Sequence, residues 1–156
     1  MEVFTMTSIL GQIDHYTAIT QQLAISGQPS QGHFSKMKAE GVQMVVHLKI
    51  EELEPVVADE EQRVVSEGIL YETLSVSFNK PSYKTFDKLA QLLQRYQKLS
   101  ILLHCNAGYC TSGLLIPYLV LYQHQSLEEA TNKMIVQKFA PQWQTFITDT
   151  IATAQV

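Results

Sequence analysis

The chain has 156 residues, a mass of 17.6 kDa, 46% hydrophobic residues and a net charge of −4 at neutral pH. This length suits one domain, residues 1–156, that buries its own core. The acidic balance, without a cluster of Lys or Arg, argues against a nucleic-acid surface. No apolar stretch is long enough to cross a membrane, and the N-terminus lacks the pattern of a signal peptide, so we expect a cytoplasmic protein.

The spacing of apolar residues predicts strands that alternate with helices. In chain order we expect a hairpin or strand within 15–26, a short helix ending at Gly41, a strand over 42–48, a helix over 59–67, a strand over 69–76, an amphipathic helix from Pro81-Ser82, a strand over 100–105, a helix from Thr111, a capping box at 126–129 and a last helix after Pro141. Pro117 should bend its helix unless it lies within the first turns. This order indicates an α/β fold with a mostly parallel central sheet of about four to five strands flanked by helices.

One segment, "SILLHCNAGYCTSG" (residues 100–113), leads from an apolar strand through a small-residue loop into a helix. In open parallel sheets, ligands bind beyond the carboxyl ends of the strands, near helix N-termini. The N–H groups of such a loop and the helix dipole favour an anion, phosphate above all. The same field favours the thiolate form of a cysteine at the start of the loop, here Cys105. The residues alone therefore predict an anion cradle beside a nucleophilic thiol.

This segment resembles the signature loop of the cysteine-dependent tyrosine and dual-specificity phosphatases. The chain is more closely similar to a bacterial phosphatase-like group related to the phosphatase-type domain of beta-lactamase-hydrolase-like proteins. "SGQPS" at 26–30, "EGVQMVVHLKIEELEP" at 40–55 and the Cys105 loop carry the resemblance, which covers about Ala24 to the helix after Ser112. The resemblance implies the phosphatase fold, with the signature loop between the last strand and a helix.

The resemblance also implies a set of site residues and a mechanism without a metal or cofactor. Cys105 would attack phosphorus to form a phosphocysteine that water cleaves. His104 would tune the thiolate through hydrogen bonds, and Ser112 (or Thr111) would stabilise it and aid hydrolysis. The phosphate-binding loop would consist of Asn106, Ala107, Gly108, Tyr109, Cys110 and Thr111.

The sequence departs from the family pattern at the arginine of the loop. In this group the arginine lies five positions after the cysteine, which is Cys110 here, and the longer spacing of other members gives Thr111. Arginine holds phosphate through two parallel hydrogen bonds, and groups that stabilise charge in such transfers contribute roughly 10²–10⁵ in rate. The two arginines, Arg63 and Arg95, fall on other predicted helices. We therefore expect an anion-binding pseudophosphatase, whose ligand is phosphate or a phosphorylated small molecule or protein.

The general acid of such a reaction is also missing from its usual place. The loop over 75–82, after the preceding strand, contains no Asp or Glu. Glu51, Glu52 and Glu54 follow another strand at the same edge of the sheet, so one of them could serve, although solvated loop carboxylates are the simpler interpretation.

Two other functions remain open from the residues. One is a weak or atypical phosphomonoester hydrolase that still uses Cys105. The other is a redox-sensitive pair of Cys105 and Cys110, if their Cα atoms come within about 4.4–6.8 Å. A zinc site is not expected, because the chain has only two thiols and no histidine at ligand spacing from them, and His47 is interpreted as packing. The substrate and the oligomeric state are not indicated.

Overall fold

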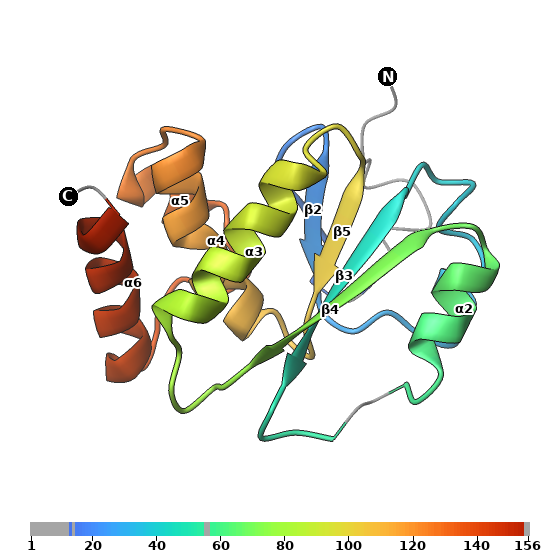
Figure 1. The fold of residues 1–156 in the computed structure, drawn as a ribbon, viewed down its shortest axis with the longest axis horizontal. Helices are drawn as coiled ribbons and strands as arrows, with labels where there is room; N and C mark the ends of the chain where they lie inside the picture. Colours follow the sequence, from blue (N-terminus) through green and yellow to red (C-terminus); the bar gives the residue numbers. More distant parts are fainter. Residues whose placement is uncertain (1–12, 14, 55–56, 155–156) are drawn as a thin grey trace.

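The computed structural model describes residue 13, residues 15–54 and residues 57–154 (Figure 1). The elements in this part of the chain are, in order, β1 (Thr17–Ala18), β2 (Leu23–Ser26), α1 (Gln31–Phe34), β3 (Met44–Ile50), α2 (Glu60–Ser66), β4 (Leu70–Val76), α3 (Tyr83–Arg95), β5 (Ile101–His104), α4 (Tyr109–Tyr122), α5 (Leu127–Asn132) and α6 (Pro141–Ala154). This order confirms the predicted alternation of strands and helices.

The strands form a five-stranded sheet in the order β1-β2-β5-β3-β4. β1 pairs antiparallel with β2, and the other neighbours pair in parallel. β5 is central, and its last residue His104 lies in register with Ser26 of β2 and His47 of β3. The carboxyl ends of the parallel strands therefore meet at one edge of the sheet, where the Cys105 loop begins. The predicted fold class is confirmed.

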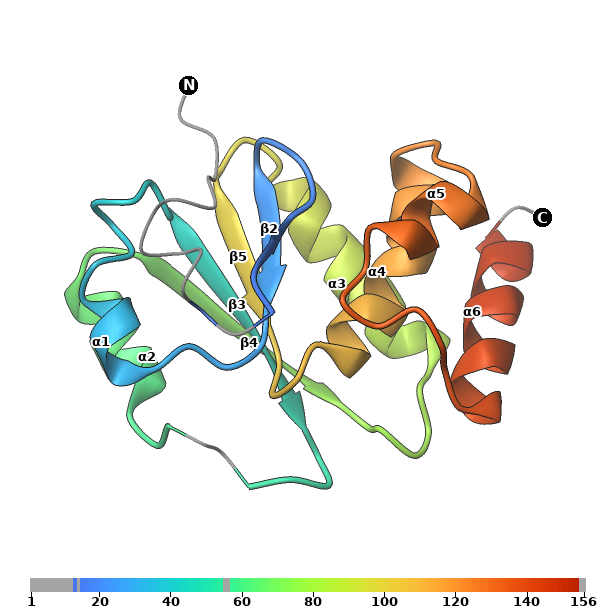
Figure 2. The ribbon, with the colours of Figure 1, turned by 180° about the vertical axis from the view of Figure 1, so that it is seen from behind.

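Two apolar clusters cover the two faces of the sheet. Alternate residues of the central strands, such as Leu103 and Leu48, join a large cluster with α3, α4 and α6. Residues on the other face, such as Leu102 and Val45, join a smaller cluster with α1 and α2. Figures 1 and 2 show α3 to α6 gathered on one side of the strands and α1 and α2 on the other. The molecule is thus a three-layer sandwich, and the helix after the Cys105 loop belongs to the thicker layer.

Helix α4 differs from the prediction at its start. It begins at Tyr109, two residues before the predicted start, and it runs without a break to Tyr122, with Pro117 deep inside it. An interior proline costs a helix about 3 kcal/mol because it removes one hydrogen bond and crowds the preceding turn. Residues 110–119 are all buried in the core, and their packing outweighs this cost.

The remaining boundaries are close to those predicted, with one clear exception. α1 ends at Phe34, well before Gly41, which instead has a φ of 95° in a turn that enters β3. The capping box at Ser126 is present and opens α5, and Ser82 caps α3 by accepting a hydrogen bond from the N–H of Thr85 (3.2 Å). Among the described residues, no helix is both long enough and apolar enough to cross a membrane.

Candidate functional site

A cavity of about 310 Å³ opens at the carboxyl end of β5. Its wall is almost entirely apolar. The lining residues come from the ends of β3 and β5, the loops after β3 and β4, and the start of α4: Ile50, Glu52, Leu53, Phe78, Cys105, Asn106, Ala107, Tyr109 and Cys110. The structure thus brings four of the predicted loop residues and Cys105 into the wall of one cavity, at the sheet edge where ligands of α/β proteins bind.

The loop itself is built around Gly108. This residue has a φ of 85°, a backbone conformation that favours glycine, and it caps the N-terminus of α4. A Cβ added there would lie 2.8 Å from Cδ1 of Ile135, so space as well as conformation requires glycine. The Gly108 N–H donates a hydrogen bond to Sγ of Cys105 (3.2 Å). The side chain of Cys105 lines the cavity and is 2% exposed, with the N–H dipole of Gly108 directed at its sulfur.

Cys110 occupies the first turn of α4, where the resemblance places an arginine. Its side chain is 2% exposed and lines the same cavity as Cys105. Burial, together with the charges of Cys105 and Glu52, raises the pKa of the Cys110 thiol well above its ordinary value. At neutral pH this position therefore carries an uncharged thiol instead of a guanidinium.

No arginine or lysine lines the described cavity. Arg63 on α2 donates to Asp59, the N-cap residue of the same helix (3.1 Å), in the opposite layer of the sandwich. Arg95 is the last residue of α3 and lines a separate groove between β4 and α3. Neither arginine replaces the one that the loop lacks.

Thr111 and Ser112, the predicted helpers of the thiolate, are both fully buried. Oγ of Ser112 accepts a hydrogen bond from the N–H of Val136 (3.2 Å), which fastens α4 to the segment between α5 and α6. Oγ1 of Thr111 has no hydrogen-bond partner among the described residues. Their roles in catalysis stay predictions of the resemblance, because neither hydroxyl bonds to Cys105 in the described part of the chain.

Aromatic side chains pack around Tyr109 and Phe78, which both line the cavity. Tyr109 packs against Phe78, Phe139 and Trp143, with ring centroids 5.1, 5.2 and 5.8 Å away. Its hydroxyl accepts a hydrogen bond from the N–H of Ala140 (2.7 Å). The indole N–H of Trp143 donates to the carbonyl of Phe78 (2.8 Å) and so holds the loop after β4 against α6. These contacts hold Tyr109 and Phe78, which both line the cavity, against α6 and the segment before it.

Glu52 is the one carboxylate in the cavity wall. It accepts hydrogen bonds from Oγ of Ser77 (2.7 Å) and from the N–H groups of Phe78 (2.7 Å) and Asn79 (3.2 Å). The Ser77 hydroxyl and these backbone donors lower the pKa of Glu52, so it is ionised at neutral pH. A general acid must carry a proton, and Glu52 is therefore poorly suited to that role.

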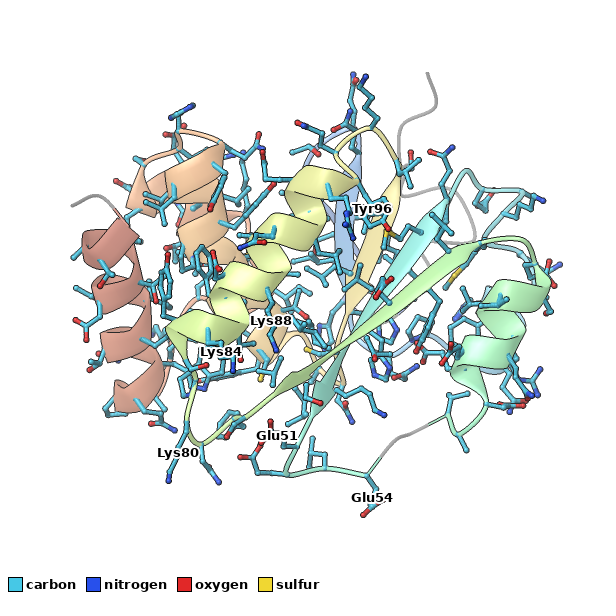
Figure 3. The ribbon with its side chains drawn as sticks, in the orientation of Figure 1. Glu51, Glu54, Lys80, Lys84, Lys88 and Tyr96 are labelled. Carbon is cyan, nitrogen blue, oxygen red and sulfur yellow. The ribbon has the colours of Figure 1, made fainter. Side chains whose placement is uncertain are left out.

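The other two candidate acids do not line the cavity. Glu51 and Glu54 are exposed in the loop after β3, and Figure 3 shows both at the lower edge of the molecule. Apart from the two thiols and the Tyr109 hydroxyl, the described lining thus contains no group that carries a transferable proton at neutral pH.

His104 takes part in a buried polar cluster that the sequence did not reveal. Its Nε2–H donates to Oε2 of Glu60 (2.6 Å), and the Tyr71 hydroxyl donates to the same oxygen (2.9 Å). Nε2 of Gln28 donates to Oε1 of Glu60 (2.7 Å), and the ring of His47 stacks on that of His104 (4.4 Å between centroids). Glu60 is 3% exposed and His104 fully buried. We call these five residues the Glu60 cluster; it lies between the sheet and α2, on the face opposite the large apolar cluster that contains Cys105.

The charges within the Glu60 cluster are set by burial and by hydrogen bonds. Burial by itself would raise the pKa of Glu60, but the hydrogen bond and the charge of His104 hold it below its ordinary value. Burial, reinforced by His104, lowers the pKa of His47 to about 4, so His47 is neutral at pH 7. The cluster is thus an ionised carboxylate surrounded by donors.

The donor set of His47, Glu60 and His104 could in principle hold a metal ion, because their ligand atoms all lie within 4.8 Å of one another. The geometry does not suit one. The two imidazole planes are only 16° from parallel, so their in-plane lone pairs do not converge on one point. Oε2 of Glu60 itself occupies the space between the donors of His104 and Tyr71.

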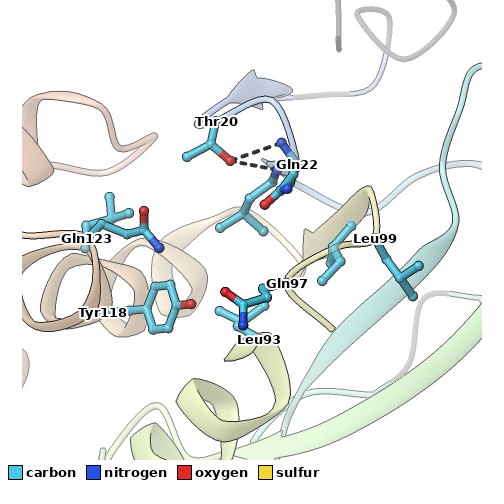
Figure 4. A pocket seen from close by; sticks show the side chains of 10 residues that line it. Thr20, Gln22, Leu93, Gln97, Leu99, Tyr118 and Gln123 are labelled. Atoms are coloured by element: carbon cyan, nitrogen blue, oxygen red, sulfur yellow. Dashed lines mark hydrogen bonds between the residues drawn. The ribbon is translucent and has the colours of Figure 1, made fainter. Parts of the chain in front are cut away.

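A second cavity, of about 110 Å³, lies at the opposite end of the strands (Figure 4). It is lined by amide side chains over an apolar floor, with Gln22, Gln97 and Gln123 at its rim and the hydroxyls of Thr20 and Tyr118 beside them. Oγ1 of Thr20 accepts hydrogen bonds from the N–H groups of residues 22 and 23. The lining of this second cavity contains none of the residues that the sequence predicts for a site.

Comparison with known proteins agrees with the fold. No protein-family model matches the chain, and no curated protein sequence is similar to it. Among solved structures, a candidate phosphatase of the DUF442 group from Shewanella putrefaciens is similar at 23% identity and a TM-score of 0.81, over 92% of this chain and 95% of that chain.

Two further solved structures are similar over most of their length. The core catalytic domain of the PP-IP phosphatase SIW14 from S. cerevisiae matches at 17% identity and a TM-score of 0.70, over 92% of this chain and 94% of that chain. PTPMT1 in complex with PI(5)P matches at 19% identity and a TM-score of 0.72, over 91% of this chain and 99% of that chain. The chain therefore has the fold of the cysteine-dependent tyrosine and dual-specificity phosphatases.

Proposed function

We propose that the chain is a pseudophosphatase, a protein with the phosphatase fold that does not turn over phosphate esters. The observation that carries this proposal is Cys110. A buried, uncharged thiol lies in the first turn of α4, where the resemblance calls for an arginine, and no cationic side chain lines the described cavity to replace it.

The missing arginine affects both binding and rate. Hydrogen bonds to a charged group contribute about 1.5–3 kcal/mol each, and a guanidinium makes two in parallel to one phosphate. Stabilisation of the transferring phosphoryl group contributes roughly 10²–10⁵ in rate. Without it, only the backbone N–H groups of the loop and the N-terminus of α4 remain to hold the oxygens of a phosphate.

A second part of the machinery is also missing. The loop after β4 contains no acid, and Glu52, which lines the cavity, is held ionised by Ser77 and by two backbone N–H groups. The leaving group of a phosphate ester would therefore depart without a proton, which typically costs a further 10²–10⁴ in rate. Two independent defects support a protein that binds without reacting.

Phosphate or a phosphorylated molecule remains the predicted ligand of the loop amides. Relatives of the same fold have been solved with PI(5)P and with citrate, both of them anionic ligands. We infer that this chain binds such groups more weakly than a loop with an arginine would, because the N–H groups of the loop act without a cation beside them.

The proposal is tested with phenyl phosphate and inorganic phosphate. We expect no phosphocysteine by mass spectrometry of the intact protein after acid quench, and binding of inorganic phosphate at least about tenfold tighter in Cys110→Arg than in the natural chain. Cys105→Ser serves as the control that removes the nucleophile. A burst of phosphocysteine in the natural chain, lost in Cys105→Ser, would instead establish the weak hydrolase; this result does not depend on whether Cys110→Arg folds.

One observation also favours the redox pair. Cys105 and Cys110 line the same cavity and both are free thiols. Hydrogen peroxide would oxidise the two thiols to one disulfide while it is reduced to two waters. Mass spectrometry after mild peroxide treatment distinguishes this disulfide from an isolated sulfinic acid at Cys105, which would exclude the pair.

A further inference from the structure

Strand β4 forms one edge of the sheet and has a partner strand on one side only. It pairs with β3 from Leu70 to Val76, and no other described strand pairs with it. The Leu70 N–H donates to the carbonyl of Gln43 (3.1 Å), and the Val76 carbonyl accepts from the N–H of Glu51 (2.9 Å). The backbone groups of a strand point alternately to its two sides, so the even-numbered residues of β4 turn theirs toward β3.

The backbone groups of Tyr71, Thr73 and Ser75 consequently point away from the sheet. Among the described residues, their N–H and C=O groups have no hydrogen-bond partner. Proteins usually protect such an edge with a proline, a bulge or several charges. β4 keeps an unbroken register with β3, contains no proline and has one charged residue, Glu72. The edge is therefore open to a further strand.

A groove of about 360 Å³ lies along this edge, between β4 and α3. Its apolar part consists of Leu74 of β4, Leu92 of α3 and Tyr96 at the end of α3, which all pack against the large apolar cluster. An edge strand beside such a groove can bind a peptide by strand addition, in which main-chain hydrogen bonds supply affinity and alternate side chains supply specificity.

The groove also carries a net positive charge. Lys88 and Arg95 line it, against one carboxylate, that of Glu72. Neither cation forms an ion pair with a described residue, and the Arg95 guanidinium lies 6.0 Å from the ring centre of Tyr96. Lys84 lies one turn before Lys88, and Figure 3 shows both on the side of α3 that is turned toward β4. Acidic side chains are therefore favoured beside this face of α3.

We propose that β4 and α3 bind an extended acidic peptide of a partner protein, which adds to the sheet as a further strand. Alternate side chains of such a peptide face α3. An apolar residue at its centre contacts Leu74 and Leu92, and an acidic residue two positions to either side lies beside Lys88 or Arg95. The two cations are about 10 Å apart along the axis of α3 and the two acids about 13 Å apart along the strand, a difference that their long side chains span.

This inference is separate from the pseudophosphatase proposal. None of the residues that line the groove lines the cavity of Cys105. Turnover of phenyl phosphate would refute the pseudophosphatase and leave the peptide site untouched, and failure of the peptide to bind would do the reverse.

The first test uses the natural chain and a labelled peptide, TETLTET, which has the required alternation of acidic and apolar residues. We expect it to bind, by fluorescence anisotropy at low salt, at least about fivefold more tightly than TKTLTKT, in which lysines replace both glutamates. Added salt should weaken the binding of TETLTET. Equal affinity for the two peptides, or no binding of either, would overturn the proposal.

A second comparison distinguishes strand addition from attraction by charge alone. The N–H groups of an added strand point alternately to β4 and to solvent. N-methylation of the central leucine of TETLTET or of the threonine after it should therefore have unequal effects, one peptide binding at least about tenfold more weakly than the other. Equal effects of the two methylations would refute an added strand.

Hydrogen exchange of the natural chain locates the paired groups. On binding of TETLTET, exchange of the N–H groups of Thr73 and Ser75 should slow, whereas that of Leu74, whose N–H points toward β3, should change little. Unchanged exchange at Thr73 and Ser75 in the presence of saturating peptide would contradict pairing with β4.

Charge reversal on α3 provides a matched pair of variants. Lys88→Glu should weaken binding of TETLTET about threefold or more and strengthen binding of TKTLTKT, whereas Lys36→Glu, the same change at an exposed residue in the turn after α1, should alter neither. Sedimentation of the natural chain alone tests the other occupant of an open edge, a second copy of the chain. A dimer that persists in the presence of TETLTET and excludes it would overturn the proposal.

Discussion

Glu60→Gln tests the energetic importance of the Glu60 cluster. The substitution keeps the shape of the side chain but removes its charge and turns one acceptor oxygen into an NH₂ donor. The carboxylate accepts three hydrogen bonds, from Gln28 (2.7 Å), Tyr71 (2.9 Å) and His104 (2.6 Å), in a site where Glu60 is 3% exposed. A glutamine amide accepts on one side only, so with its oxygen toward Tyr71 and His104 it can no longer accept from Nε2 of Gln28.

The expected cost follows from this hydrogen-bond count. The two donors that still meet the carbonyl oxygen lose the strengthening that comes from a charged acceptor, about 1 kcal/mol each. The third, from the partly exposed Gln28, is lost, which costs about 0.5–1.5 kcal/mol. The substitution also removes the cost of burying a charge, which offsets part of this loss. We therefore expect a loss of about 2–4 kcal/mol in the free energy of unfolding, a large fraction of the stability of a domain of this size.

The assay is urea denaturation at pH 7, followed by fluorescence of the single tryptophan, Trp143, which is buried. Glu61→Gln is the matched control, because Glu61 is the next residue of α2 and is exposed; its loss should stay near 0.5 kcal/mol or below. If Glu60→Gln and Glu61→Gln are equally stable within the error of the assay, the carboxylate of the Glu60 cluster does not hold α2 to the sheet and the reasoning is wrong.

Other predictions concern the same cluster and the packing of α4. The depressed pKa of His47, about 4, means that the unfolded chain takes up a proton near pH 6.5 while the folded chain does not; stability should therefore be full above pH 6.5 and fall between pH 6.5 and 4. In His47→Gln, urea midpoints measured across this range should vary less with pH than in the natural chain. Gly113→Ala would place a Cβ 2.4 Å from Cε3 of Trp143, so we expect a loss of about 1–3 kcal/mol in urea denaturation, against the gain that alanine usually brings to a helix. Trp143→Phe removes the 2.8 Å hydrogen bond to the Phe78 carbonyl as well as part of the ring, and should lower the thermal midpoint by several degrees. An unchanged midpoint would show that the Trp143 side chain does not stabilise the fold in this way.

Much of the fold follows from local patterns in the sequence. Residues 100–113 contain an apolar run, a small-residue loop and Gly108 within a short stretch of chain. The structure has a strand, a loop and a helix there. The caps at Ser82 and Ser126 are equally local. Such features are predictable because the hydrogen bonds and dihedral angles that they require involve residues close in the chain. The start of α4 was less well predicted, since packing of the whole buried helix decides it.

The sequence by itself determined that an arginine is absent from the loop, because a missing residue type is visible without coordinates. Only the tertiary structure decided which of several neighbouring acidic side chains is buried or lines the cavity. Among the acidic residues 59–61, only Glu60 is buried against the sheet, where it accepts hydrogen bonds from residues of β4, β5 and the loop after β2. Among Glu51, Glu52 and Glu54, Glu52 is the one that accepts hydrogen bonds from the loop after β4. These partners lie up to 44 residues apart in the chain, and no local period relates them. The physical reason is that burial and charge at a site depend on which elements pack together, and that packing is a property of the folded chain as a whole.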